Sequence, residues 1–152
     1  MASERVLIVG APGVGKTTLA ETHRERLGLK MFLCTDTLAQ ARKARGVHER
    51  AMYAPSCFDG ADMWSELSQW VADTWFCNRG PWVIEGVAAV RALRKWHADN
   101  PGQPPPCETL LWPTEPRIDL SPRAQAMGNT HDEKMHELLH DWPELGLMVK
   151  MV

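Results

Sequence analysis

The chain lacks the features of a membrane-spanning or secreted protein. Its 152 residues contain no apolar run that approaches the roughly 18 residues needed for a membrane-spanning helix. The opening residues, MASER, show neither the basic start nor the apolar stretch of a leader peptide. From these absences we expect a soluble, cytoplasmic protein, or one of the host cytoplasm if the source is a virus.

The four cysteines form no metal-binding or redox pattern. The sequence has no C-x-x-C pair, and no histidine stands near them at zinc-finger spacing. A chain of this length can bury on the order of 70% of its unfolded surface, so it needs neither a disulfide nor a structural metal. We therefore expect Cys34, Cys57, Cys77 and Cys107 to be reduced and mostly buried thiols.

Internal repeats and charged tails are also absent, which favours a single domain spanning residues 1–152. The proline-rich stretch 100–106 (NPGQPPP) must be a loop and is too short to separate domains. Short apolar runs predict strands at 5–9, 31–34, 82–84, 109–112 and 147–152, and helical patterns fall at about 16–28, 37–45, 62–77, 87–97 and 122–140. Strands that alternate with helices predict an α/β fold, with a parallel sheet of four to five strands covered on both faces.

One glycine-rich segment carries a specific chemical signal. Residues 10–17, GAPGVGKT, match G-x-x-x-x-G-K-[ST] and stand between a predicted strand and a predicted helix. The glycines let backbone N–H groups turn toward phosphate oxygens, and the helix adds its positive dipole end. The alternative is a glycine-rich turn with an incidental lysine. The motif predicts a site for ATP with Mg²⁺, with Lys16 at the β- and γ-phosphates and Thr17 on the metal. The predicted nucleotide-binding residues are Gly10, Ala11, Pro12, Gly13, Val14, Gly15, Lys16, Thr17 and Thr18.

With this loop the sequence resembles the small kinases of the P-loop group, above all the kinase domain of polynucleotide kinases, and more distantly nucleoside and shikimate-type kinases. The resemblance implies the three-layer P-loop NTPase sandwich with a short lid, and transfer of phosphate from ATP to a hydroxyl. It also implies that Asp36, after the second strand, accepts the hydroxyl proton, and that Glu85, ending the third, supports Mg²⁺ or its waters. Alternatively, Asp36 caps a turn or helix before Thr37, and Glu85 has no catalytic role.

The resemblance further implies a lid after the fourth strand, with arginines that cover the transferred phosphate. Arg117 and Arg123 lie in the corresponding segment, PTEPRIDLSPR, although either could be a plain surface residue.

Two basic stretches would border the acceptor in this layout. They are represented by Arg42 and Arg45 in the first and by Arg91 and Arg94 in the second. They favour an anionic acceptor, a nucleotide or a nucleic acid, over a neutral sugar; solvated helix faces are the alternative reading. The segment 121–128, SPRAQAMG, also looks like phage kinases that phosphorylate hydroxymethyluracil in DNA.

Seven tryptophans are available for stacking on bases, but most are expected in the core. Trp64 and Trp75 fall on an apolar helical stripe, and two others lie on strands. This leaves Trp70, Trp96 and Trp142 as stacking candidates.

Sequence motifs of other functions are the alternatives to a kinase. No N-K-x-D motif supports a GTPase, whereas a P-loop ATPase or a nucleotide-binding regulatory module stays open. His136 and His140 complete an H-E-x-x-H motif, which on a helix can hold zinc, but a third ligand does not follow at the usual spacing. A zinc metallohydrolase is therefore a remote alternative.

Overall fold

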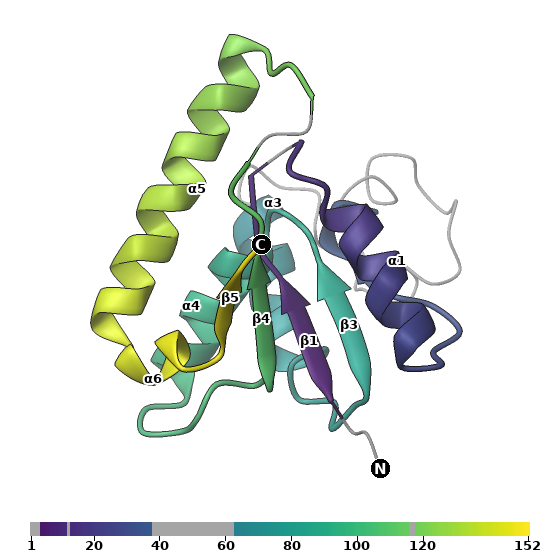
Figure 1. Cartoon of the computed structure of the whole chain (residues 1–152). Coiled ribbons are helices and arrows are strands. Elements are labelled where there is room, and N and C mark those ends of the chain that lie inside the picture. Colours follow the sequence, from purple (N-terminus) through teal and green to yellow (C-terminus); the bar gives the residue numbers. More distant parts are fainter. Residues whose placement is uncertain (1–3, 12, 38–62, 116–117) are drawn as a thin grey trace.

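The computed structural model describes residues 4–11, 13–37, 63–115 and 118–152. In these residues five strands form one sheet: β1 (Arg5–Ile8), β2 (Leu33–Cys34), β3 (Trp82–Glu85), β4 (Thr109–Trp112) and β5 (Val149–Met151). Their order is β2-β3-β1-β4-β5, and every pair is parallel (Figure 1). β1 is thus central, between β3 and β4. The predicted P-loop NTPase α/β sandwich with a five-stranded parallel sheet is confirmed.

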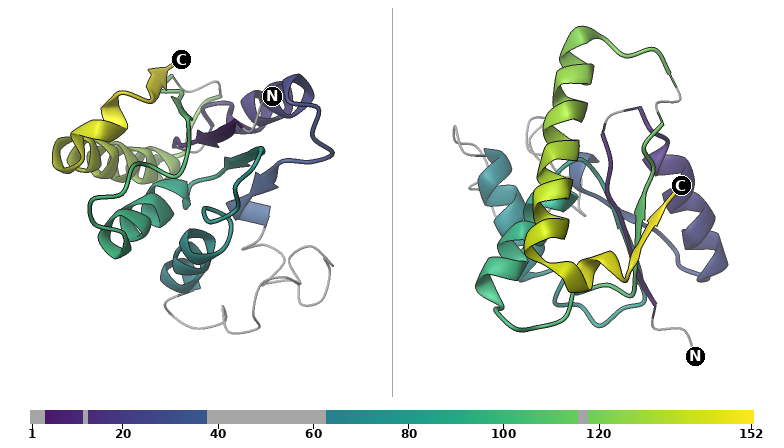
Figure 2. Two further views of the ribbon diagram at one scale, coloured as in Figure 1. Left: turned by 90° about the horizontal axis from the view of Figure 1, so that it is seen from below. Right: turned by 60° about the vertical axis from the view of Figure 1, so that its left-hand side comes forward.

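Helices cover both faces of the sheet, as predicted. α1 (Lys16–Arg26) lies on one face, while α3 (Met63–Asp73), α4 (Ala89–Asp99) and α5 (Pro122–Asp141) lie in a row on the other (Figure 2). A short helix, α6 (Pro143–Gly146), leads into β5. Within the described part of the chain, no helix is both long enough and apolar enough to cross a bilayer.

The central strand distributes its side chains between two cores. Successive residues of a strand point to opposite faces of the sheet. Val6 and Ile8 accordingly pack with Ala20 of α1, whereas Leu7 and Val9 join the larger cluster beneath α3, α4 and α5. These four side chains, from Val6 to Val9, are completely buried, which explains why this segment is a continuous apolar run.

Several element boundaries differ from the sequence prediction. The second strand is only Leu33–Cys34, the helix predicted to reach residue 77 ends at Asp73, and α6 was not predicted at all. The predicted helix 37–45 lies largely outside the described residues. Among the described cysteines, all three are free thiols; Cys107 is buried, Cys34 is half-buried and Cys77 is exposed, while Cys57 is outside the described residues.

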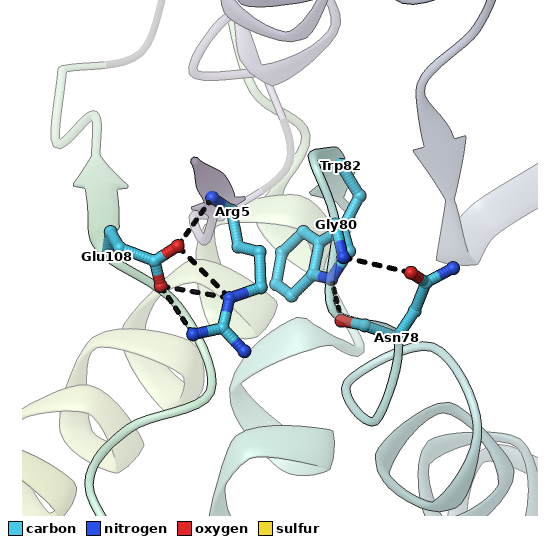
Figure 3. A network of polar contacts seen from close by, with 5 residues as sticks. All are labelled: Arg5, Asn78, Gly80, Trp82 and Glu108. Atoms are coloured by element: carbon cyan, nitrogen blue, oxygen red, sulfur yellow. Dashed lines mark hydrogen bonds and ion pairs between the residues drawn. The ribbon is translucent and has the colours of Figure 1, made fainter. Parts of the chain in front are cut away.

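An ion pair joins β1 and β4 at the amino end of the sheet (Figure 3). The Arg5 guanidinium donates to Glu108 through Nε and Nη2, at 2.9 and 2.7 Å, and the Arg5 backbone N–H donates to the same carboxylate at 3.1 Å. Beside it, the backbone N–H of Gly80 and the indole of Trp82 both donate to Asn78, each at 2.9 Å. These contacts fasten the strands at the end opposite the phosphate loop.

Replacing Glu108 by alanine is expected to lower the free energy of unfolding by about 1 kcal/mol, because the pair is bidentate but partly exposed. Urea denaturation of the variant measures the effect. Glu133→Ala, which removes an exposed carboxylate from α5, is the matched control. Equal stability of the two variants would show that the Arg5 pair adds nothing.

Candidate active site

The phosphate loop connects the end of β1 to the start of α1. Gly13 and Gly15 have φ values of +80° and +86°, in the left-handed region that favours glycine. Gly10 is required for a different reason, since a Cβ there would lie 2.8 Å from the side chain of Val14, which folds under the loop. Pro12 lies outside the described residues. The strand, tight turn and helix that the motif requires are therefore all present.

Lys16 begins α1 and bends back across the loop. Its side chain is buried, with the residue only 7% exposed, and Nζ donates to the carbonyl oxygen of Ala11 at 2.7 Å. The helix has Gly15 as its N-cap with no side-chain cap, and its first turn contains no acidic residue. Thr17 and Thr18 follow with exposed side chains. The uncapped N–H groups, the helix dipole and the ammonium group make this helix end suited to bind an anion.

Glu85 lies at the carboxyl end of β3, beside the phosphate loop. In the sheet register it pairs with Ile8 of β1 on one side and Cys34 of β2 on the other. The residue is 2% exposed, and burial raises the pKa of its carboxyl group, although the Cys34 thiol and Lys16 oppose this shift. Burial and the neighbouring Glu85 raise the pKa of Cys34 to about 11, so the thiol stays protonated. For Lys16 the pKa shift has the opposite sign: burial lowers the pKa of its ammonium group, although the negative charges of Asp36 and Glu85 oppose this shift.

Asp36 stands just past β2, held toward β3. Its Oδ1 accepts hydrogen bonds from the Thr35 hydroxyl and the Val87 backbone N–H, both at 3.2 Å. Gly86 permits this approach, because a Cβ at Gly86 would lie 1.8 Å from the Thr35 hydroxyl oxygen. Among the described residues, no hydrogen bond reaches the other carboxylate oxygen of Asp36. Within the described residues, the side chain thus makes its hydrogen bonds through one carboxylate oxygen.

The segment after β4 lies against the phosphate loop. A Cβ at Gly13 would be 2.7 Å from Leu120, and one at Gly128 of α5 would be 3.1 Å from Ala11. Ser121 caps α5 by accepting a hydrogen bond from the Ala124 N–H at 3.2 Å. The predicted lid position is therefore occupied by residues 118–121 and the start of α5, which carries Arg123. Arg117 lies outside the described residues.

A cavity of about 550 Å³ opens between α3, α4 and α5. Its cationic lining consists of Arg91, Arg94, Arg123 and Lys134. None of the described residues that line it carries a carboxylate. Lys134 approaches Glu137 at 3.7 Å, whereas the three guanidinium groups have no hydrogen-bond or ion-pair partner within the described part of the chain.

The structure thus brings together the predicted acceptor residues Arg91 and Arg94 with Arg123, which was predicted from the lid. Arg42 and Arg45 are outside the described residues.

Two aromatic residues of the cavity, Trp64 and His131, were not assigned to it from the sequence. Trp64, placed on a core stripe, is 36% exposed and lines the cavity. His131 of α5 is buried; its Nδ1 lies 3.3 Å from the Asp132 carboxylate, and its Nε2 has no hydrogen-bond partner among the described residues. Burial lowers the pKa of His131, and the nearby Lys16 lowers it further. His131 faces inward because it lies on the buried face of α5, together with Met135 and Leu138, which follow it at helical spacing.

The tryptophans predicted to stack on bases differ in their burial. Trp142 is only 4% exposed and stacks on Trp96 and His97, with ring centroids 6.0 and 4.1 Å apart, so it is a core residue and its prediction as a base-stacking residue is wrong. Trp70 is half-buried and packs edge-on against Trp75 at 5.7 Å.

The H-E-x-x-H histidines lie on the outer face of α5. Both His136 and His140 are exposed, and His136 meets the edge of Trp112 at a centroid distance of 5.3 Å. Across the described residues, no group of three histidine, cysteine or carboxylate side chains could hold a metal ion. The third ligand that a zinc site needs is thus not supplied by this part of the chain.

Neither a protein-family model nor a curated protein sequence matches the chain. Among solved structures it is similar to a shikimate kinase from Acinetobacter baumannii in complex with shikimate, with 16% sequence identity and a TM-score of 0.49. The alignment covers 97% of this chain and 81% of that one. The class of the molecule, a P-loop α/β protein, follows from its strand order and its loop.

Replacing Glu85 by glutamine is expected to raise the free energy of unfolding at neutral pH by about 1–2 kcal/mol, because a buried carboxylate costs stability. The folded pKa of Glu85 is raised above its unfolded value of about 4.3. The native state therefore holds the proton more strongly, and wild-type stability falls as pH rises through the interval between the two values.

The stability gap between Glu85→Gln and wild type should accordingly widen with pH across that interval and then level off. Urea denaturation from pH 4.5 to 8 measures it. A gap that is independent of pH, or a variant less stable than wild type at pH 7, contradicts the expectation.

Proposed function

We propose that the protein is an ATP- and Mg²⁺-dependent kinase that transfers the γ-phosphate to a hydroxyl of an anionic acceptor, a nucleotide or nucleic acid. One observation carries the proposal. Lys16, Asp36 and Glu85 stand at the carboxyl ends of β1, β2 and β3, which are adjacent in the sheet, and an arginine-lined cavity opens beside them. Ligands of open α/β sheets bind at this edge.

The nucleotide site would use the residues of the motif. The loop N–H groups and the uncapped start of α1 suit the phosphates of ATP, and Lys16 is placed to exchange its bond to the Ala11 carbonyl for phosphate oxygens. Thr17 and Glu85 supply the hydroxyl and the carboxylate that suit Mg²⁺ or its waters. Bound Mg²⁺ would neutralise charge on the phosphates.

Asp36 would orient the acceptor hydroxyl and take its proton. One carboxylate oxygen is held by Val87, and the other has no hydrogen bond to a described residue. Val87 also lines the cavity, so an acceptor bound there lies on the side where Asp36 is held. A carboxylate in this place can act as the general base as the phosphoryl group transfers. Arg123 would contribute positive charge from the lid side.

The lining of the cavity supports an anionic acceptor. Three guanidinium groups that have no ion-pair partner among the described residues favour phosphate or carboxylate groups over a neutral sugar. Within this class, the hydroxymethyl group of hydroxymethyluracil in DNA is the most specific candidate, suggested by the likeness of segment 121–128 to phage kinases.

The experiment is a phosphate-transfer screen with labelled ATP and Mg²⁺. Acceptors would include nucleosides, nucleotides, 5′-hydroxyl DNA, DNA containing hydroxymethyluracil, and shikimate. Label on a nucleotide or nucleic acid, with little acceptor-independent ATP hydrolysis, is the expected result. Hydrolysis that ignores every acceptor would instead favour a P-loop ATPase or regulatory module, and label on shikimate alone would remove the nucleotide acceptor.

A further inference from the structure

We infer that Trp64 is a stacking platform in the acceptor cavity, so that the acceptor is an anion carrying a planar aromatic ring, in the form of a nucleobase joined to a phosphorylated sugar. The inference rests on the proposed function and specifies how its acceptor is recognised. It begins from an indole that is 36% exposed on a helix where Leu67 and Val71 are completely buried.

The backbone that carries Trp64 is held firmly. The Lys95 ammonium of α4 donates to the carbonyl and hydroxyl oxygens of Ser65, at 2.7 and 2.6 Å. One turn further along α3, the Ser68 hydroxyl donates to the Trp64 carbonyl at 2.7 Å. The indole is therefore presented at the cavity by a helix turn that is fixed to its neighbour. A preorganised aromatic face loses little conformational freedom when a ring stacks on it.

The remaining lining divides into an apolar part and a cationic part. Val87, Ala88 and Val90 provide apolar surface near the start of α4, and Arg91, Arg94 and Arg123 provide the guanidinium groups. A ligand that satisfies both parts needs an apolar or aromatic face and an anionic group. A nucleotide unit has both. A sugar phosphate lacks an aromatic ring, and an alicyclic hydroxy acid lacks the π-face that stacks on indole.

The cavity also borders the reaction centre on two sides. Val87, whose N–H holds Asp36, lies on one side. His131 of α5 lies on the other, one turn after Gly128, where an added Cβ would be 3.1 Å from Ala11 of the phosphate loop. A unit stacked on Trp64 would therefore be next to the residues proposed to transfer the phosphate.

The test measures equilibrium binding, without ATP, of two phosphorylated sugars, of which one carries a nucleobase and the other does not. They are deoxyuridine 5′-monophosphate and deoxyribose 5-phosphate. Wild type should bind the nucleotide about tenfold more tightly, as expected for one stacked base. Trp64→Phe should keep most of this preference and Trp64→Leu should lose it. Arg94→Ala should weaken both ligands equally, whereas Arg79→Ala, which removes an exposed arginine outside the cavity, should change neither.

Equal affinity of the two ligands for wild type, binding of neither, or a ring preference that survives Trp64→Leu would overturn the inference. Binding is measured without turnover, so these results do not test the kinase proposal, which the transfer screen tests. The stacking inference and the kinase proposal can therefore fail separately. A short single-stranded oligonucleotide identifies the source of the nucleotide unit. Tighter, Trp64-dependent binding of the oligonucleotide indicates a polymer, and a preference for the monophosphate indicates a free nucleotide.

Discussion

Lys16→Met is expected to reduce kcat/KM for phosphate transfer by on the order of 10²- to 10³-fold, which is typical for loss of one preorganised donor at a site of developing charge. The fold should persist. The ammonium makes one hydrogen bond in the structure, to the Ala11 carbonyl, and its burial lowers its pKa, so replacing it by an apolar side chain of similar length removes a group that is costly to bury.

Steady-state kinetics and the thermal shift caused by Mg²⁺ and ATP test this prediction together. In wild type, saturating nucleotide should raise the melting temperature, because the ligand binds only the folded state. The variant should keep a cooperative unfolding transition but show a reduced shift. Lys30→Met, at an exposed lysine after α1, is the matched control and should behave as wild type. Full activity of Lys16→Met would remove the phosphate-loop assignment.

The fold was predictable where the signal is local. The apolar runs of β1, β3 and β4 are bounded by glycine, proline or charge, and they identify buried strands without tertiary information. α6 was missed because the four residues PELG are too few to show helical periodicity. β2 is shorter than predicted; among the described strands it lies at the edge of the sheet and pairs with β3 alone, so its length depends on that partner.

The candidate carboxylates came from the resemblance to small P-loop kinases, which implies one carboxylate after the second strand and one at the end of the third. The register places Cys34, two residues before Asp36, opposite Glu85. Trp64 and His131 could not be placed in this way. Whether a helical side chain is buried or faces a cavity depends on how α3 and α5 pack, which periodicity alone does not determine.

Asp36→Asn is expected to lower kcat by about 10²- to 10⁴-fold, the usual contribution of a general base, with little change in the KM for ATP. The amide oxygen can still accept the Val87 N–H, so the packing between β2 and the start of α4 should be kept. The amide cannot take a proton from the acceptor hydroxyl. The variant therefore separates the chemical role of the carboxylate from its structural one.

Asp36→Ala completes the comparison, because it also removes the hydrogen bond to Val87 and should lose about 1 kcal/mol of stability. If the carboxylate acts as the base, Asn and Ala variants should be similarly inactive although only the Ala variant is destabilised. If Asp36 merely holds Val87 in place, Asp36→Asn should stay active and only Asp36→Ala should fail. Asp73→Asn, at the exposed end of α3, controls for the loss of one negative charge. Kinetics and urea denaturation of the three variants therefore distinguish a base from a structural anchor.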